Sequence, residues 1–521
     1  MPKLSSVLPL LRAGFVLARE GVVSALPAEA LPPPVRFAHT IAGWIARRRA
    51  AGARSSQRLT VAVNRLGPSW VKLGQFLATR PDIVGREMAG ELELLQDRMA
   101  PFATDAARTA VEQSLGRPVD EVFGSFSEPI AAASIAQVHR AVRRRDGATV
   151  AVKVIRPGIR DQFHRDLQTF FSAAQLLEQW VPATHRLRPV AVVEMLQRSA
   201  RIEMDLRLEA AALAELGANT ASDPGFRVPA PDWELTGRDC LTLEWAEGVR
   251  PSDRETLIAA GHDPVRIAAA LVQNFLRHTL RDGFFHADMH PGNLFIDKAG
   301  DIVAVDLGIM GRLGRKEQRF LAEILHGFII GDYRRVARVH LEAGYVPRTH
   351  SEESFAQAIR AIGEPIHGQP ADTISMAKLL TLLFEVTELF DMQTRPELLL
   401  LQKTMVVVEG VARRLDPEFN MWKTAAPVVS EWLPRHVGPA AIVGDAAEAV
   451  SAARSLLRQL PELARRAEKL AGRMEGMAEN GLSLDEETLR KLAAEQARRN
   501  RSGRWALWVI ALISFLLWTG L

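Results

Sequence analysis

The stretch FFHADMHPGNLFIDKAGDIVAVDLGIMGRL, residues 284–313, constrains the fold of this chain more than any other. Two alternating apolar runs flank a Lys-Ala-Gly tip at 298–300, a pattern that predicts a β-hairpin. Asp288 and Asn293 precede this hairpin in a short loop, and Asp306 follows its second strand. The hairpin should therefore bring two carboxylates and one amide together in the fold.

Two carboxylates and an amide in this order suit phosphoryl transfer from a nucleotide. Mg²⁺ prefers hard oxygen ligands and retains some waters, so one carboxylate and one amide suffice as protein ligands. Protein kinases supply the base and both metal ligands from H-R-D-x-x-x-x-N followed by D-F-G. The corresponding strings here are HAD at 286–288, Asn293, and DLG at 306–308. The alternative is that these residues only cap a loop and end a strand.

A site of this kind also needs a strand lysine and a loop above the phosphates. The run VAVKV supplies Lys153 near the end of an alternating strand. Upstream, PIAAASIAQVHRA fits the glycine-rich template G-x-G-x-x-G-x-V, but with alanine at each glycine position. The matching residues are Ala131, Ala133, Ala136 and Val138. The lysine and the loop in the right register predict the second half of a phosphate site.

Alanine in place of glycine should change how such a loop behaves. Glycine lets backbone N–H groups approach phosphates without a Cβ in the way, whereas alanine adds a methyl group and disfavours positive φ. We therefore expect a loop that is stiffer than a glycine-rich one and that starts a helix instead of a flexible flap. Such a loop would disfavour ATP poised for transfer.

The segment IEMDLRLEAAALAEL, residues 202–216, is predicted to be one helix that carries the carboxylate orienting the lysine. Glu203 can face Lys153 from this helix, and Glu209 lies roughly a turn and a half further on. The alternative is that both glutamates belong to a solvated helix face.

The composition is that of a globular protein with little cysteine. The 521 residues, 47% apolar and 24% charged, allow one large domain with extensions or two or three ordinary domains. The single cysteine, Cys240, excludes an intramolecular disulfide framework and a cysteine-based metal cluster. The net charge of +4 is small for this length, and no basic region is interleaved with aromatic residues. We therefore expect no nucleic-acid partner.

Both ends of the sequence carry segments that suit a membrane surface. Residues 1–50 read as basic and helical, and Arg12, Arg19 and Glu20 interrupt the apolar run that a signal peptide would need. Residues 505–521 carry no charge, reach the lower length limit of a membrane-spanning helix and follow several arginines. We expect a single-pass anchor there, with a buried terminal helix or an oligomerisation helix as the alternative.

The order of the elements predicts an α+β protein, with strands gathered in one lobe and helices in the next. The expected parts are a basic amphipathic helical segment at 1–50, a helical extension at 51–125, a small β-rich lobe with a hinge at 126–250, a large helical lobe at 251–435, a helical linker at 436–504 and a transmembrane anchor at 505–521. Lys153 belongs to the small lobe and Asp288 to the large one, so the site should be split between them.

Four motifs make the chain resemble the UbiB family of atypical protein-kinase-like proteins, which is related to the mitochondrial coenzyme Q kinases. They are the K-x-G-Q string at 72–75, the alanine-rich loop, the E-x-D string at 203–205 and the loop HADMHPGN. The resemblance runs from about residue 10 to residue 435. The pairing of K-x-G-Q with an alanine-rich loop separates it from ordinary kinases. The resemblance implies an atypical protein-kinase-like fold of the α+β class.

The resemblance implies a role for each residue around the phosphates. Asp288 occupies the catalytic-base position, and Asn293 and Asp306 hold Mg²⁺. Lys153 binds the α- and β-phosphates of ATP and pairs with Glu203.

The resemblance also names the residues that cover the nucleotide and those that restrain the site. The covering loop consists of Ile130, Ala131, Ala132, Ala133, Ser134, Ile135, Ala136, Gln137 and Val138. The hinge near adenine runs from Glu244 to Glu247. Lys72 and Gln75 lie on a helix folded over the site, where a kinase would admit a peptide, and Glu209 belongs to the same restraining group.

The resemblance further implies ATP and Mg²⁺ as cofactors and support of ubiquinone (coenzyme Q) biosynthesis at the bacterial inner membrane. The chemistry would be ATP hydrolysis or phosphorylation of a small-molecule or lipid acceptor. Membrane lipids and quinone precursors are the expected partners, with other ubiquinone-biosynthesis proteins and a second copy of the chain as further candidates. One alternative is a phosphotransferase of the aminoglycoside or choline kinase type, which lacks K-x-G-Q. Another is a pseudokinase scaffold that binds ATP and holds quinone-biosynthesis enzymes together.

Overall fold

The computed structural model describes residues 4–22, 55–78, 99–180, 188–367 and 396–437, with a few further residues in the gaps between these ranges. All of the described residues except Val437 belong to one compact unit, Met1–His436. Most of the basic segment at 1–50, the linker predicted at 436–504 and the anchor predicted at 505–521 lie outside these ranges. Within the described ranges, no helix combines the length and the apolar character needed to cross a membrane.

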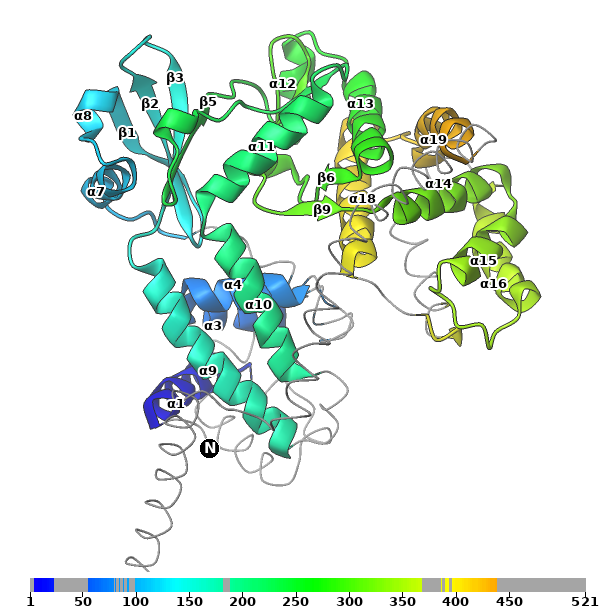
Figure 1. Cartoon of the computed structure of the whole chain (residues 1–521), viewed down its shortest axis with the longest axis horizontal. Coiled ribbons are helices and arrows are strands. Elements are labelled where there is room, and N and C mark those ends of the chain that lie inside the picture. The colour runs from blue at the N-terminus through cyan, green and yellow to red at the C-terminus, as the bar shows by residue number, and fades with distance from the viewer. Residues whose placement is uncertain are drawn as a thin grey trace, which may run out of the picture. The chain divides into compact units, whose positions relative to one another are not determined.

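The small lobe contains a four-stranded antiparallel sheet. Its strands, in spatial order, are β1 (Phe123–Ala132), β2 (Ala136–Arg143), β3 (Thr149–Ile155) and β5 (Cys240–Glu244). Two helices, α7 (Thr104–Leu115) and α8 (Val119–Val122), lie beside the sheet (Figure 1). The alternating strand predicted to carry Lys153 is thus confirmed as β3.

The alternating sequence of β3 sorts its side chains onto the two faces of the sheet. Val150, Val152 and Val154 are buried in one cluster with Val111 of α7. Lys153 alternates with these valines and therefore points to the opposite face. The apolar contact with α7 thus sets the register that presents Lys153 to the site.

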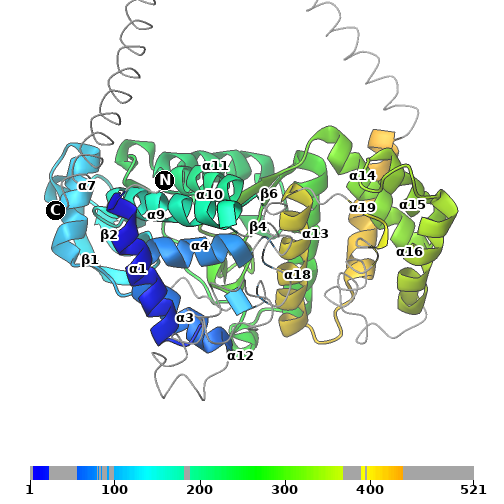
Figure 2. The ribbon, with the colours of Figure 1, turned by 90° about the horizontal axis from the view of Figure 1, so that it is seen from below.

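The helices of the N-terminal extension pack around α9 (Figure 2). They are α1 (Leu4–Arg19), α3 (Ser55–Leu66) and α4 (Pro68–Ala78), and they are joined by α9 (Ile159–Trp180) and α10 (Pro189–Glu203). Trp70 of α4 meets Phe170 of α9 edge to face, with ring centroids 4.9 Å apart. Arg65 of α3 pairs with Glu20 at the end of α1 at 2.5 Å. These contacts tie the extension to a helix that directly follows β3.

The single helix predicted over 202–216 is two helices. α10 ends at Glu203, and α11 (Leu206–Thr220) begins three residues later. Asp205 lies between them with extended backbone, and its carboxylate accepts a hydrogen bond from the Arg207 N–H, as an N-cap residue does. Glu203 therefore ends one helix, whereas Glu209 lies in the first turn of the next.

The predicted hairpin of the large lobe is confirmed. Two helices, α12 (Arg254–Ala259) and α13 (Pro264–Arg277), and a π-helical turn, η6 (His278–Asp282), lead to the strands β6 (Phe284–His286), β7 (Leu294–Ile296), β8 (Ile302–Ala304) and β9 (Met310–Arg312). β7 and β8 form the antiparallel hairpin, and β6 pairs with β9. Gly300 has φ +87° in the hairpin turn, a conformation that glycine adopts readily. A two-residue strand, β4 (Phe226–Arg227), runs parallel to β8.

The rest of the described chain is helical, as predicted. It consists of α14 (Arg315–Ile330), α15 (Tyr333–Glu342), α16 (Glu352–His367), α18 (Pro396–Leu415) and α19 (Met421–Val437). α15 and α16 pack on each other around Val336, Phe355 and Ile359. α18 packs along α13, which precedes the loop that carries Asp288 (Figure 1).

Candidate active site

Lys153 is the centre of the site, because it binds carboxylates from two distant segments. Its Nζ lies 2.9 Å from both Oε1 and Oε2 of Glu209 on α11, and 2.8 Å from Oδ1 of Asp306 after β8. The predicted pairing of Lys153 with Glu203 is therefore wrong. A second helix begins after Asp205, and Glu209 in the first turn of this helix bonds Lys153.

Glu203 instead pairs with Lys72 of the K-x-G-Q string on α4. The two side chains are only 10% (Lys72) and 16% (Glu203) exposed. A Cβ added to Gly308 would lie 3.9 Å from Cγ of Glu203 and 3.3 Å from Oδ1 of Asp306, so this pair adjoins the DLG turn. Gln75 is half-buried one turn further along α4. The extension thus places a second lysine in the cluster that contains Lys153.

Burial and mutual attraction set the protonation of this cluster. Burial raises the pKa of Glu209 to about 7, although Lys153 opposes the shift. Burial alone would lower the pKa of Lys153, but Asp306 and Glu209 outweigh it and raise that pKa above its ordinary value. Desolvation would raise the pKa of Asp306, but Lys153 outweighs it and holds that pKa at about 2. When all five groups are ionised, the three carboxylates exceed the two ammonium groups by one negative charge.

Asp306 adopts a backbone conformation that few residues tolerate. Its φ is +60°, in the left-handed region, where the short polar side chain of aspartate is accepted more readily than bulkier ones. The next residue, Leu307, takes the place of phenylalanine in D-F-G and is buried. The Asp306 side chain contacts Lys153 but is still 49% exposed, so it remains accessible to a ligand.

Asp288 and Asn293 are bonded to each other across the loop between β6 and β7. Nδ2 of Asn293 donates to the Asp288 carbonyl oxygen at 3.1 Å and to Oδ2 of Asp288 at 3.3 Å. The Val305 N–H donates to the Asn293 carbonyl at 2.8 Å, which holds Asn293 next to the segment that carries Asp306. The structure therefore brings the three predicted residues of the catalytic loop and the DLG turn into one region.

The oxygen donors fit Mg²⁺. Because Nδ2 of Asn293 is bonded to Asp288, Oδ1 of Asn293 is the amide atom that could ligate a metal. Oδ1 of Asn293 and the carboxylate of Asp306 are hard oxygen ligands of the kind that Mg²⁺ prefers. In the described part of the chain, no three His, Cys, Asp or Glu side chains form a metal cluster on their own. Phosphate oxygens and waters would complete the coordination.

The backbone that carries Asp288 is held from two sides. The Ala287 N–H donates to the Ile309 carbonyl at 3.1 Å, next to the DLG turn. The hydroxyl of Thr404, a fully buried residue of α18, lies 3.0 Å from the Ala287 carbonyl oxygen and 2.8 Å from the Leu400 carbonyl oxygen, so the two carbonyls share its one proton. Sequence reasoning missed Thr404, because it lies 117 positions after Ala287 and no motif marks it.

The alanine-rich loop is the tip of a hairpin and does not start a helix, which corrects the expectation from the sequence. β1 ends at Ala132 and β2 begins at Ala136, and the Ala133 N–H donates to the Ala136 carbonyl at 2.8 Å. Positive φ among the described non-glycine residues is confined to Arg188, Asp306 and Asp391. The loop alanines therefore adopt conformations that need no glycine.

The predicted hinge follows β5. Glu244 pairs with Arg227 at 3.0 Å, and Glu247 pairs with Lys298 at 3.3 Å. The guanidinium of Arg140 on β2 lies 5.3 Å from the ring centroid of Trp245. Both hinge carboxylates are therefore paired with basic side chains.

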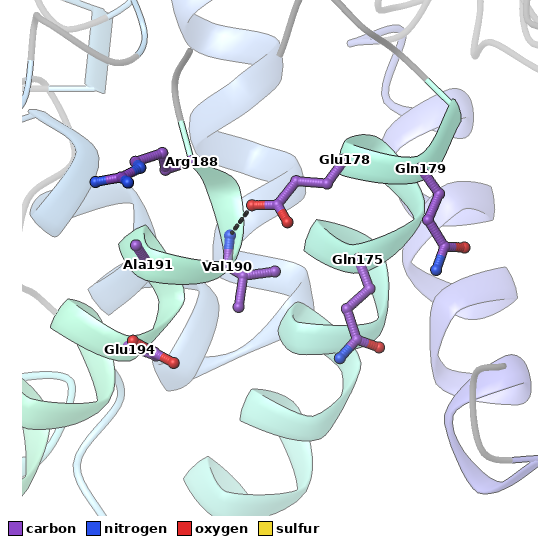
Figure 3. A pocket seen from close by; sticks show the side chains of 7 residues that line it. All are labelled: Gln175, Glu178, Gln179, Arg188, Val190, Ala191 and Glu194. Carbon is purple, nitrogen blue, oxygen red and sulfur yellow. Dashed lines mark hydrogen bonds between the residues drawn. The ribbon is translucent and has the colours of Figure 1, made fainter. Parts of the chain in front are cut away.

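A separate hollow of about 630 Å³ lies between the end of α9 and the start of α10 (Figure 3). Glu178 is part of its wall, and its Oε1 accepts a hydrogen bond from the Val190 N–H at 3.0 Å. None of the residues predicted for the site lines this hollow. The candidate site is therefore the Lys153 cluster and not this hollow.

Known proteins match this chain over most of its length. Residues 94–340 match the ABC1 atypical kinase-like domain, and residues 359–420 match the UbiB helical domain. The chain is similar to "Probable protein kinase UbiB" of Marinobacter nauticus, with 37% identity over 97% of this chain and 92% of that protein. The protein of the same name from Aeromonas hydrophila is 38% identical over 87% of this chain and 84% of its own length.

A Mycobacterium tuberculosis protein, solved in complex with erythromycin, aligns with a TM-score of 0.49 and 23% identity. The alignment covers 75% of this chain and 98% of that protein.

Proposed function

Because the chain belongs to the UbiB family of ABC1 atypical kinase-like proteins, we propose that it binds Mg-ATP and transfers or hydrolyses the terminal phosphoryl group. The observation that carries this proposal is the convergence of Glu209 and Asp306 on Lys153. Kinase-like phosphoryl transfer needs a lysine oriented by a carboxylate, next to an aspartate that binds the metal. The cluster supplies all three groups.

Each residue of the site has a separate role in the proposed reaction. Lys153 exchanges its contact with Asp306 for phosphate oxygens, while Glu209 keeps its ammonium group oriented. Asn293 and Asp306 would hold Mg²⁺, which when bound neutralises charge on the phosphates. Asp288 orients the acceptor hydroxyl or water and takes up its proton. The bond from Asn293 fixes the Asp288 carboxylate for that role.

We place this activity in ubiquinone biosynthesis at the bacterial inner membrane, with the catalytic domain in the cytoplasm. The similarity to proteins named UbiB over most of the chain supports this assignment. The uncharged segment 505–521 supports a single-pass anchor. The acceptor in this proposal is a small molecule or a lipid, and quinone precursors, membrane lipids, other ubiquinone-biosynthesis proteins and a second copy of the chain are the proposed partners.

The proposal includes a restraint on the site. Lys72 enters the cluster from α4 and bonds Glu203, so this helix must shift before a large substrate can enter. On α1, an apolar stripe is exposed: Leu8 by 76%, Leu11 by 64% and Phe15 by 49%. α1 contacts α3 and α9, so a lipid surface that binds α1 could displace the extension. If anionic liposomes left the ATP turnover of the purified protein unchanged, this part of the proposal would be abandoned.

The proposed catalysis is tested by Asp288→Asn, with Asp301→Asn in the neighbouring hairpin as the matched control. ATP hydrolysis is measured on purified protein, with and without membranes and quinone precursors, and quinone synthesis is measured in cells. Loss of both activities in Asp288→Asn alone supports catalysis. Retained quinone synthesis in that variant would instead favour an ATP-binding scaffold.

A further inference from the structure

The segment just before α7 lies along the alanine-rich loop. The Met99 N–H donates to the Ala132 carbonyl at 3.4 Å. Three residues later, the Phe102 N–H donates to Oε1 of Gln137 at 2.9 Å, and Nε2 of Gln137 donates to the Phe102 carbonyl at 3.2 Å. The side chain of Gln137 thus binds both polar groups of one residue. Residues 99–102, here called the crossing segment, connect the N-terminal extension to the small lobe.

Gln137 is fixed from its other side by a buried histidine. Its Nε2 also donates to Nε2 of His139 at 2.9 Å, so Nδ1 of His139 carries the proton and donates to the Ser127 carbonyl at 2.8 Å. The His139 ring stacks on Phe126 with centroids 4.5 Å apart. Gln137 and His139 are 1% and 0% exposed. A buried amide whose donors and acceptor are all satisfied has one orientation, so Gln137 is a rigid connection.

Arg156, directly after β3, joins the same two segments. Its N–H donates to the Ile135 carbonyl at 2.8 Å, inside the loop. Its guanidinium donates to the Ala100 carbonyl at 3.0 Å and to the Ala133 carbonyl at 3.4 Å. The guanidinium also lies 5.1 Å from the ring centroid of Phe102, close enough for a cation–π contact. One arginine therefore contacts both the loop and the crossing segment.

We infer that Gln137 and Arg156 are positioning residues that tie the alanine-rich loop to the crossing segment and so determine how the loop receives a nucleotide. The inference rests on the proposed binding of Mg-ATP. It adds that the rigidity of the loop comes from this tie as well as from its alanines. The extension then acts on the site at two places: through Lys72 at the carboxylate cluster and through the crossing segment at the loop.

The test uses Gln137→Met and Arg156→Met in the full chain. Arg144→Met is the matched control, because Arg144 also donates to a backbone carbonyl of the small lobe, that of Asp120 at 2.9 Å. Hydrogen exchange of the peptide covering residues 130–138 is measured without nucleotide, and the dissociation constants of MgADP and MgATP are measured by calorimetry. Arg156→Lys, which keeps the charge but not the fork of donors, serves if a methionine variant fails to fold.

We expect loop amides to exchange about tenfold faster in Gln137→Met and Arg156→Met, because each loses two or more hydrogen bonds, and to be unchanged in Arg144→Met. The ratio of the two dissociation constants should shift severalfold in the same two variants only. A lower melting temperature with unchanged loop exchange, or with unchanged nucleotide constants, would overturn the inference. Failure of the wild-type protein to bind either nucleotide would refute the proposed function, while the exchange measurement would still decide whether the tie exists.

Discussion

The ion pair between Lys72 and Glu203 makes a quantitative prediction about stability. Both side chains are at least four-fifths buried. Removing one partner of a buried pair leaves an uncompensated charge and costs about 3–5 kcal/mol. Lys72→Met should destabilise the fold by that amount. Glu203→Gln should cost less, because Lys72 keeps the attraction of the Asp306 carboxylate. The double variant removes both charges and should cost much less than the two single variants together.

The expected change in melting temperature follows from the size of the unit. Unfolding entropy is about 2.1 cal/mol/K per residue. The compact unit Met1–His436 therefore has an unfolding entropy of about 0.9 kcal/mol/K. Lys72→Met should then melt about 3–5 °C below the wild-type protein, and Glu203→Gln should lose less. The double variant should melt at least about 2 °C above the temperature that the sum of the two single losses would give.

Differential scanning calorimetry of the full chain measures these values, and the exposed pair Arg312–Glu215 is the control. Its side chains are 65% and 40% exposed, so breaking it should cost less than about 1 kcal/mol. If Glu203→Gln lowered the melting temperature equally with and without Lys72→Met, the two residues would not be coupled. The restraint of the site by α4 would then lose its structural basis.

Three further variants test other parts of the site. Thr404→Val removes the hydroxyl that bonds the Ala287 carbonyl and should lower kcat about tenfold by loosening the Asp288 loop. Thr404→Ser keeps a hydroxyl and should stay near the wild-type kcat. Equal kinetics of the two variants would contradict this role of Thr404. Burial raises the pKa of Glu209 from its ordinary value of 4.5 to about 7 in the folded state. Between these two pH values, Glu209 therefore holds a proton in the folded state that it has released in the unfolded chain. The free energy of unfolding of the wild-type protein should therefore fall relative to Glu209→Gln as pH rises from 4.5 to about 7, in urea titrations at several pH values; parallel curves would refute the shift. Ala133→Gly should change the affinity for MgADP or MgATP in calorimetry, and identical constants for both would show that the alanine has no part in selectivity.

The local features of the site could be predicted from the sequence, because they depend on short-range patterns. The alternating runs around 298–300 specify the β7–β8 hairpin, and the valines around Lys153 specify both its strand and its face. The sequence has alanine at the positions where the kinase template has glycine. The conformation of these alanines could not be predicted, because pairing of β1 with β2 decides it, and pairing is a property of the sheet.

The partners within the site could not be predicted in the same way. Residues 202–216 have a helical composition throughout, and only the N-cap at Asp205 divides them into two helices. As a result of this division, Lys153 pairs with Glu209 and not with Glu203. An aspartate followed by a helical run is an N-cap signal, so the sequence itself carries one indication of this division. Thr404 is different, because its contact with Ala287 depends on the packing of α18 and α13, which no local pattern encodes.

The central claim is that Lys153, Asn293 and Asp306 form a site for Mg-ATP. Calorimetric titration of ATP into the purified full chain, with Mg²⁺ and with EDTA, tests it most directly when wild type and Asp306→Asn are compared. We predict binding to the wild-type protein that weakens at least tenfold in EDTA, and binding to Asp306→Asn that no longer responds to Mg²⁺. Equal affinity of the wild-type protein in Mg²⁺ and in EDTA would contradict the claim.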